Sequence, residues 1–188
     1  ILTANAVVTN VDCNGNSTGK ITVNANGGTT AYEILWDGPG ANDGSALDVA
    51  APYMIANLPA GAYSVTVRDA NNGTVVLSPT ITEPVAVTAN IRPKTDATCF
   101  GAANGTAMAN GVNGTAPYTY LWSNGSTDKT ATGLASGAYT VTVSDMMKCT
   151  NTATVTINQP TDITVNVGSI ANADCAGGDD GSATATAT

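Results

Sequence analysis

The chain has 188 residues, of which 14 are acidic and 6 basic, so its formal net charge is −8. This acidity argues against nucleic acid and anionic membranes as partners, because both require a basic face on the protein. There is no histidine, the commonest general base and metal ligand, and only 11% of the residues are charged, unlike a helical protein rich in Glu, Lys and Arg.

The first predicted element is a strand over residues 1–9, which leaves no place for a signal peptide at the start of the chain. No stretch reaches the roughly 20 consecutive apolar residues of a membrane span, so we expect none in this segment. We interpret the chain as an internal window of a longer protein, with its export signal and anchor outside this window.

Short runs in which apolar and polar residues alternate follow along the chain: Ile21, Val23 and Ala25, then Tyr63, Val65 and Val67, and later Tyr139, Val141 and Val143. Such alternation indicates strands with one buried and one solvent-facing side. The Asn- and Gly-rich segment 69–73 lies after the second run and predicts a turn.

The same pattern of residues occurs more than once. The motif C-x-G-x-x-x-G begins at Cys13, Cys99 and Cys175. The first two copies stay in register at an offset of 86 as far as Trp36 and Trp122, and at an offset of 76 beyond them because the first copy has an insertion within residues 37–52. The later matches are Leu58 with Leu134, Gly61 with Gly137, Tyr63 with Tyr139, Asp69 with Asp145, and Pro84 with Pro160.

These matches predict one repeat at residues 1–84, a second at 85–160 and the start of a truncated third at 161–188. Pro84 and Pro160 form the inter-repeat linkers, where proline removes a backbone donor and stiffens the chain. Six or seven short strands in about 80 residues are typical of an immunoglobulin-like sandwich. We therefore predict an all-β fold of tandem immunoglobulin-like β-sandwich repeats stacked end to end, forming a semi-rigid rod.

The repeats resemble the SprB repeat family of Bacteroidetes surface proteins. The second repeat carries Cys99, a Pro-Tyr-Thr-Tyr-Leu-Trp segment ending at Trp122, a Leu-Ala-Ser-Gly-Ala-Tyr-Thr-Val-Thr-Val-Ser-Asp segment ending at Asp145, Cys149 and Pro160. The first repeat departs twice, with Ala31 in place of the proline and Gly73 in place of the second cysteine. The resemblance implies a very large, gliding-motility type surface adhesin exported by the type IX secretion system.

Four aromatic residues are candidates for structural roles. Trp36 and Trp122 occupy equivalent strand positions, and the expected role is core packing, as for the buried tryptophan of immunoglobulin sandwiches. The alternative is a sugar-stacking platform. Tyr63 and Tyr139 begin a strand in the manner of a tyrosine corner and are also expected to be structural.

The carboxylates give no catalytic or metal-binding pattern. Asp69 and Asp145 each end a strand before a turn, where we expect them to cap backbone N–H groups, with calcium binding as the alternative. No calcium-binding loop of spaced oxygen ligands is evident, and no histidine is present to activate a nucleophile. We expect no catalytic residue, no cofactor, no metal required for folding, and no enzyme.

The cysteines allow three full pairings. Cys13, Cys99 and Cys175 hold the same position in successive repeats, about a domain length apart, whereas the Cα atoms of bridged cysteines lie within roughly 7 Å. Cys149 is the only cysteine at the second site. We therefore predict a disulfide between Cys99 and Cys149, with Cys13 a buried free thiol and the partner of Cys175 beyond Thr188. The alternative is four reduced cysteines packed as small apolar residues.

Two functions follow from this organisation. The first is a structural stalk of a large secreted surface adhesin, located outside the cell and contacting neighbouring repeats of the same chain. The alternative is a module that binds surface glycans or other cell-surface or secretion proteins through the loop at residues 37–52, since loops on rigid sandwiches often carry function.

Overall fold

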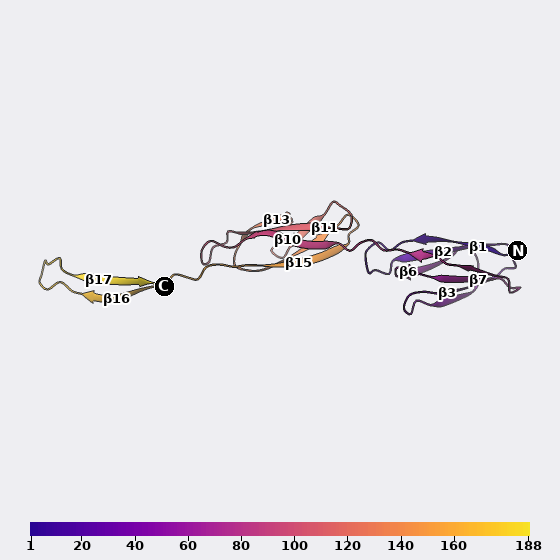
Figure 1. Ribbon diagram of the computed structural model, residues 1–188, viewed down its shortest axis with the longest axis horizontal. Helices are drawn as coiled ribbons and strands as arrows, with labels where there is room; N and C mark the ends of the chain where they lie inside the picture. The colour runs from indigo at the N-terminus through magenta and orange to yellow at the C-terminus, as the bar shows by residue number, and fades with distance from the viewer.

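The computed structural model describes all residues from Ile1 to Thr188 and contains strands but no helix. Two sandwiches and a C-terminal hairpin follow one another along a single long axis (Figure 1). The prediction of an all-β chain of immunoglobulin-like sandwiches stacked end to end is confirmed.

The first sandwich pairs a sheet of order β1-β2-β5 with a sheet of order β4-β3-β7-β8, and β6 and β9 form a small additional pair. Its strands are β1 (Thr3–Thr9), β2 (Gly19–Asn26), β3 (Tyr32–Asp37), β4 (Gly44–Val49), β5 (Tyr53–Leu58), β6 (Gly61–Ala62), β7 (Ser64–Arg68), β8 (Thr74–Leu77) and β9 (Thr80–Ile81).

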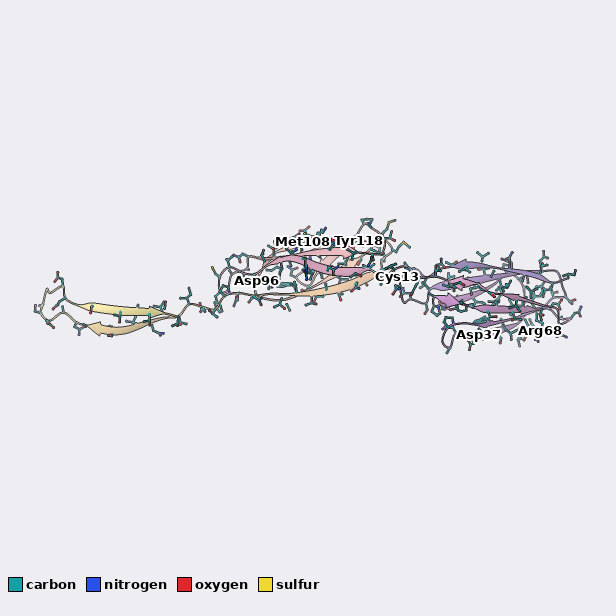
Figure 2. All side chains as sticks on the ribbon, viewed as in Figure 1. Cys13, Asp37, Arg68, Asp96, Met108 and Tyr118 are labelled. Atoms are coloured by element: carbon teal, nitrogen blue, oxygen red, sulfur yellow. A yellow bond between two sulfur atoms is a disulfide. The ribbon has the colours of Figure 1, made fainter.

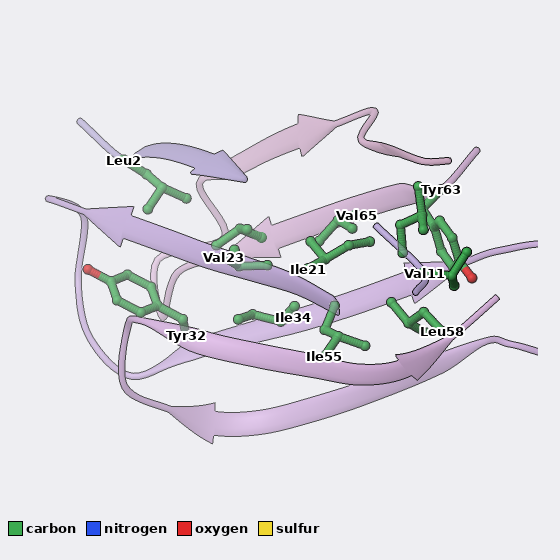
Figure 3. Close-up of a cluster of buried hydrophobic side chains, with 12 residues drawn as sticks. Leu2, Val11, Ile21, Val23, Tyr32, Ile34, Ile55, Leu58, Tyr63 and Val65 are labelled. Atoms are coloured by element: carbon green, nitrogen blue, oxygen red, sulfur yellow. The ribbon is translucent and has the colours of Figure 1, made fainter. Parts of the chain in front are cut away.

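Alternation of apolar residues in β2 and β7 builds the core between these two sheets. Ile21 and Val23 from β2 and Val65 and Val67 from β7 are fully buried, and Ile34 of β3 packs with them (Figure 3). Because successive side chains of a strand point to opposite faces, the Thr and Asn residues between them remain near the surface.

The second sandwich pairs a sheet of order β10-β11-β13 with a sheet of order β12-β14-β15. Its strands are β10 (Thr88–Thr95), β11 (Gly105–Val112), β12 (Thr119–Trp122), β13 (Thr130–Leu134), β14 (Gly137–Ser144) and β15 (Thr150–Ile157). Small residues supply much of its core, since Ala107, Ala109 and Ala131 are fully buried around Trp122.

The connection between β12 and β13 determines at which end of the sandwich the later strands begin and end. β12 is antiparallel to β14, with Trp122 opposite Val141, and β13 is antiparallel to β11, with Leu134 opposite Gly105. Within the sheets, β13 is therefore parallel to β10 and β12 is parallel to β15. β10 and β15 run in the same direction, because Asn151 donates to the Val87 carbonyl at one end and the Asn158 N–H donates to Asp96 at the other. β12 and β13 thus run in the same direction, each along part of the sandwich, while the chain crosses from one sheet to the other. β14 therefore starts at the end of the sandwich that holds Gly105 and finishes at the opposite end.

The insertion at residues 37–52 forms a strand and its connections. Residues Gly44–Val49 are β4, which pairs with β3 and adds a fourth, edge strand to its sheet. The equivalent sheet of the second sandwich has three strands. The expectation that this segment is a loop is therefore wrong: its polar turns flank a run, Ser-Ala-Leu-Asp-Val, with enough strand propensity to pair with β3.

The C-terminal hairpin consists of β16 (Val165–Ala171) and β17 (Ser182–Ala187). Its pairing repeats that of β10 and β11 at an offset of 76: Val165 faces Ala187 as Ala89 faces Gly111, and both ladders shift register in the middle of the first strand. All residues of the hairpin are exposed. The hairpin thus has the backbone of the first two strands of a sandwich.

Candidate functional site at the junction of the two sandwiches

The Cys13 loop, defined here as residues 12–18, lies at the end of the first sandwich that faces the second sandwich. The side chain of Asp12 organises it: its Oδ1 accepts hydrogen bonds from the Cys13 N–H (2.7 Å), the Thr18 hydroxyl (2.7 Å) and the Asn16 amide (3.0 Å). The bond from Thr18, followed by that from Asn16, holds the pKa of the Asp12 carboxyl below its usual range, although burial opposes this. Cys13 is thereby presented toward the second sandwich.

The facing surface is the turn between β14 and β15. Asp145 lies inside it, 4% exposed. Its Oδ1 accepts the N–H of Cys149 and its Oδ2 accepts the N–H of Thr115, both at 2.9 Å. Gly114, with φ of 65°, lies so close that a Cβ there would sit 2.7 Å from the carboxylate. A glycine at this position is therefore required for Asp145 to reach both donors.

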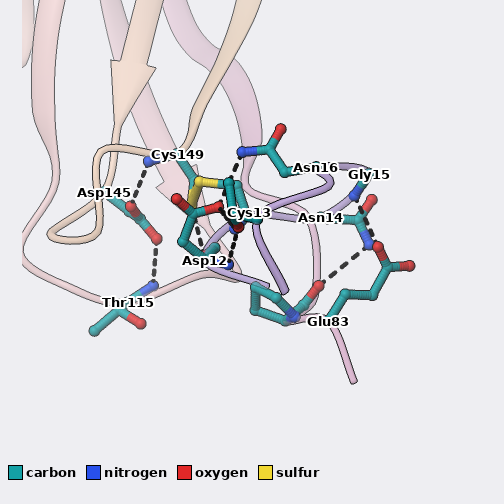
Figure 4. The surroundings of a disulfide bond; sticks show 11 residues. Asp12, Cys13, Asn14, Gly15, Asn16, Glu83, Thr115, Asp145 and Cys149 are labelled. Atoms are coloured by element: carbon teal, nitrogen blue, oxygen red, sulfur yellow. Dashed lines mark hydrogen bonds between the residues drawn. A yellow bond between two sulfur atoms is a disulfide. The ribbon is translucent and has the colours of Figure 1, made fainter. Parts of the chain in front are cut away.

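A disulfide joins the two surfaces. Cys13 and Cys149 are bonded with their Cα atoms 5.4 Å apart and 136 residues apart in sequence (Figure 4). The Cys149 Sγ also lies 3.3 Å from the carbonyl oxygen of Asp12. Cys13 lies where the first sandwich meets the second (Figure 2) and packs against the core of the second. The bond therefore spans the junction between the two sandwiches.

The predicted pairing of Cys99 with Cys149 is wrong, as is the prediction that Cys13 is a free thiol. Cys99 and Cys175 are the free cysteines, and both are exposed. Cys99 follows β10 at one end of the second sandwich, whereas Cys149 precedes β15 at the other end. β15 has eight residues, and a rise of about 3.3 Å per residue separates its ends by roughly 25 Å, far beyond the reach of a disulfide.

The polypeptide linker runs beside the disulfide. Glu83 Oε2 accepts the N–H of Gly15 at 2.7 Å, and the Pro84 carbonyl accepts the Asn14 amide at 3.2 Å. On the other side, the Asn151 amide donates to the Val87 carbonyl at 2.7 Å. Between linker and disulfide lies a cleft of about 240 Å³, lined by both sandwiches. The junction is thus held by two covalent connections and by hydrogen bonds from each side to the linker.

Asp69 occupies in the first sandwich the position that Asp145 has in the second. It accepts the N–H groups of Gly73 (2.7 Å), Asn71 (3.0 Å) and Thr29 (3.1 Å). The bond from Gly73 lowers the pKa of the Asp69 carboxyl most, and burial works against it. Both aspartates therefore hold their turns through backbone donors, and no group of three or more acidic or cysteine side chains gathers to hold a metal ion.

The aromatic residues predicted to be structural lie in or against the cores. Trp122 is 1% exposed, and its Nε1 donates to the Asp128 carbonyl at 3.0 Å. Trp36 is only half-buried, with its ring centroid 6.4 Å from that of Tyr53 and its edge covered by Gly44 of β4. Tyr63 is buried and Tyr139 half-buried, and each hydroxyl donates to the carbonyl four residues earlier, of Pro59 and Ala135.

The second linker repeats part of the first. Before Pro160, Gln159 Oε1 accepts the N–H of Gly101 at 2.9 Å, as Glu83 accepts Gly15 before Pro84. The side chain preceding each linker proline thus ties the linker to the cysteine loop of its own sandwich. This tie depends on one Glu or Gln residue, which no motif of the sequence singles out.

Comparison with known families agrees with this organisation. The family model described as SprB repeat matches residues 5–41 and residues 92–127. Two segments of the chain thus match the SprB repeat. Each match covers the first cysteine motif and ends shortly after the tryptophan, so Cys13 and Cys99 lie in the matched segments. The resemblance inferred from the sequence is confirmed.

Three solved structures have a partial likeness to the chain. They are a C-terminal 282-residue fragment of intimin in complex with the intimin-binding domain of its translocated receptor (16% identity, 89% of this chain and 65% of that chain, TM-score 0.43), Dpr2 Ig1-Ig2 in complex with DIP-Theta Ig1-Ig3 (13%, 89% and 69%, 0.31), and the amphioxus IgVJ-C2 molecule (15%, 82% and 96%, 0.32). The chain spans less than two thirds of the intimin fragment. No curated protein sequence matches it. The fold contains no helix long and apolar enough to cross a membrane.

Proposed function

We propose that the chain is a section of the stalk of a large secreted adhesin at the cell surface, supporting surface adhesion and gliding motility. Its units are residues 1–84 and 85–160, with a third starting at 161, and its partners are the neighbouring repeats of the same chain. It has a structural role and no catalytic one. Export by the type IX secretion system and an extracellular position agree with the SprB repeats and with a disulfide, which persists in oxidising surroundings.

The observation that carries this proposal is the position of the disulfide in the path of a pulling force. Tension applied to the two ends of the chain passes from Cys13 directly to Cys149 through the sulfur atoms. The 136-residue separation between them corresponds to roughly 460 Å of extended chain, which is kept out of the loaded path. A stalk built this way resists unravelling even when individual sandwiches are only marginally stable.

A second feature suits a stalk. The sandwiches lie end to end, and hydrogen bonds from Asn14, Gly15 and Asn151 hold the linker beside the disulfide. Two covalent connections at different points of one junction oppose bending and twisting, whereas a single chain allows both. The junction therefore keeps the two sandwiches in a fixed relative orientation.

Single-molecule pulling from the two ends of the 188-residue chain tests the proposal. We expect the oxidised chain to extend by roughly 460 Å less than the reduced chain. Cys13→Ser should extend like the reduced protein under all conditions, and Cys99→Ser, the matched control, should behave like the wild type. Equal extension of the oxidised and reduced wild type would contradict a stalk protected by this bond.

A second candidate function is a glycan- or protein-binding module centred on residues 37–52. It is favoured by β4, which is paired on one side only and exposes Leu47; an unpaired edge can accept a strand from a partner. Removing residues 38–47, which reduces the insertion to the length found in the second repeat, should abolish binding on a glycan array or to purified surface proteins. Unchanged binding would exclude this segment as the site.

A further inference from the structure

Three loops of the chain have one conformation. In each, the N–H of the residue before the cysteine donates to the side chain six residues later, and the cysteine carbonyl accepts the N–H three residues later. The first bonds are Asp12 to Thr18 (3.1 Å), Thr98 to Asn104 (3.0 Å) and Asp174 to Asp180 (3.2 Å). The second are Asn16 to Cys13 (3.1 Å), Ala102 to Cys99 (3.1 Å) and Gly178 to Cys175 (3.0 Å).

A glycine with positive φ sits two residues after each cysteine, with φ of 78° at Gly15, 72° at Gly101 and 89° at Gly177. Side chains other than glycine rarely adopt this conformation. The three loops therefore share a backbone path, although only the loop of Cys13 contacts a second sandwich. The loop conformation is a property of the loop sequence and does not depend on the bond to Cys149.

The Cys99 loop, residues 98–104, also has the same relation to its linker. Gln159 accepts the N–H of Gly101 just before Pro160, as Glu83 accepts the N–H of Gly15 just before Pro84. Cys99 is exposed, as is Phe100 beside it. The second sandwich thus presents a cysteine toward the next unit from the position at which the first sandwich presents Cys13.

The receiving surface is also repeated. Around Asp145 the cleft at the junction includes Thr115, Met147 and Cys149. Around Asp69 an open cleft is lined by the equivalent Thr29, Asn71 and Gly73. Both carboxylates accept the N–H at the second-cysteine position, at 2.9 Å for Cys149 and 2.7 Å for Gly73. Each sandwich therefore has a cysteine loop at one end and an Asp-capped turn at the other, and the turn of the second sandwich receives the Cys13 loop.

We propose that the Cys99 loop docks on the Asp-capped turn of the repeat that follows it, and that Cys99 forms a disulfide there with a cysteine at the position equivalent to Cys149. In this arrangement every junction has the same pairing, in which the first cysteine of one repeat bonds to the second cysteine of the next repeat. The two thiols lose two protons and two electrons as the S–S bond forms, and a small-molecule disulfide accepts them by thiol–disulfide exchange. A glycine at the second site, as at Gly73, leaves the junction docked without a covalent bond.

This proposal deepens the stalk function and rests on it for its biological meaning. Cys149 and Cys175 are 26 residues apart, so in a chain of such junctions a force leaving one disulfide crosses only a short segment before it reaches the next cysteine. The disulfide of Cys99 then spans this segment in parallel. Consecutive bonds overlap along the chain, so every residue between the first and the last bonded cysteine is enclosed by at least one bond.

The test extends the full chain so that Cys99 faces a complete repeat. Thr188 corresponds to Val112 at the offset of 76, so appending a copy of residues 113–160 after Thr188 completes the third repeat and supplies a second Cys149. After refolding with reduced and oxidised glutathione, non-reducing peptide mapping should identify two bonds: Cys13 to Cys149, and Cys99 to the copied Cys149. Cys175 should be the single free thiol. Cys99→Ser in this protein, the matched control, should leave the copied Cys149 free.

A second design tests the proposal if the third repeat, assembled from residues 161–188 and the copy of residues 113–160, does not fold. Residues 1–160 followed by a copy of residues 85–160 contain only complete repeats of natural sequence, and Cys99 should again bond to the copied Cys149. A bond between the two cysteines of one repeat, or an unpaired Cys99 in folded oxidised protein, would overturn the proposal. These outcomes are independent of the pulling experiment, which concerns only the bond between Cys13 and Cys149.

Discussion

Asp145 positions Cys149 for the inter-sandwich bond: its Oδ1 accepts the N–H of Cys149 at 2.9 Å, while its Oδ2 accepts the N–H of Thr115. Asp145→Ala removes both acceptors inside a buried turn. Leaving two such donors without partners should lower the free energy of unfolding by about 2–4 kcal/mol. Urea unfolding monitored by Trp122 fluorescence measures the loss. Asp128→Ala, which removes a carboxylate that accepts no hydrogen bond, is the control and should have little effect.

The free thiols should reveal the pairing directly. The oxidised native protein should react with a maleimide at Cys99 and Cys175 only, because Cys13 and Cys149 are bonded. In Cys13→Ser, Cys149 should become a third free thiol and should not re-pair with Cys99, since β15 separates the two by roughly 25 Å. A Cys99–Cys149 peptide in this variant would mean that the ends of the second sandwich are assigned incorrectly.

Acid should weaken the first sandwich through Asp69. Because the bond from Gly73 lowers the pKa of this carboxyl in the folded state, below the value near 3.9 of an unfolded aspartate, folding favours the ionised form. The stabilisation is complete above the unfolded pKa and is lost as the pH falls through the folded pKa. The Tm of the wild type should therefore fall more steeply than that of Asp69→Asn between about pH 5 and pH 2. Parallel Tm curves for the two proteins would exclude this role.

The two tryptophans should differ in their contribution to stability. Trp122→Ala removes a ring that is 1% exposed and should cost about 3–5 kcal/mol. Trp36→Ala should cost less, because Trp36 is half-buried and packs at the edge of its core. Hydrogen exchange of the β14 and β7 amides reports each sandwich separately. Equal losses of protection would show that β4 and Tyr53 bury Trp36 more completely in solution than the structure indicates.

Pro84 should matter mainly when the disulfide is open. Pro84→Gly keeps the carbonyl that accepts the Asn14 amide but frees the backbone of the linker. With Cys13 bonded to Cys149, small-angle scattering should give nearly the same particle length as for the wild type. After reduction the variant should become more flexible than the reduced wild type. A large change in the oxidised variant would place the stiffness of the junction in the linker alone.

The features that depend on local patterns could be predicted from the sequence. Alternation in 21–25 and 63–67 predicts strands because a half-buried strand repeats every two residues. The position of Asp69 and Asp145 before a turn predicts a polar residue that meets backbone donors. The matching positions of the cysteines, tryptophans and prolines indicate the repeat and its resemblance to the SprB family. All of these follow from neighbours within a few residues or from comparison of one segment with another.

The pairing of Cys149 was decided only by the tertiary structure. If each strand reversed the direction of the chain, Cys149 would lie at the same end of its sandwich as Cys99, and the predicted bond could form. β12 and β13 instead run in the same direction in different sheets, so one reversal is lost and Cys149 lies at the opposite end, facing Cys13. Sheet partners set strand direction, and these partners are more than ten residues away in sequence. The residues identify which groups can react; the path of the chain between the sheets determines which of them meet.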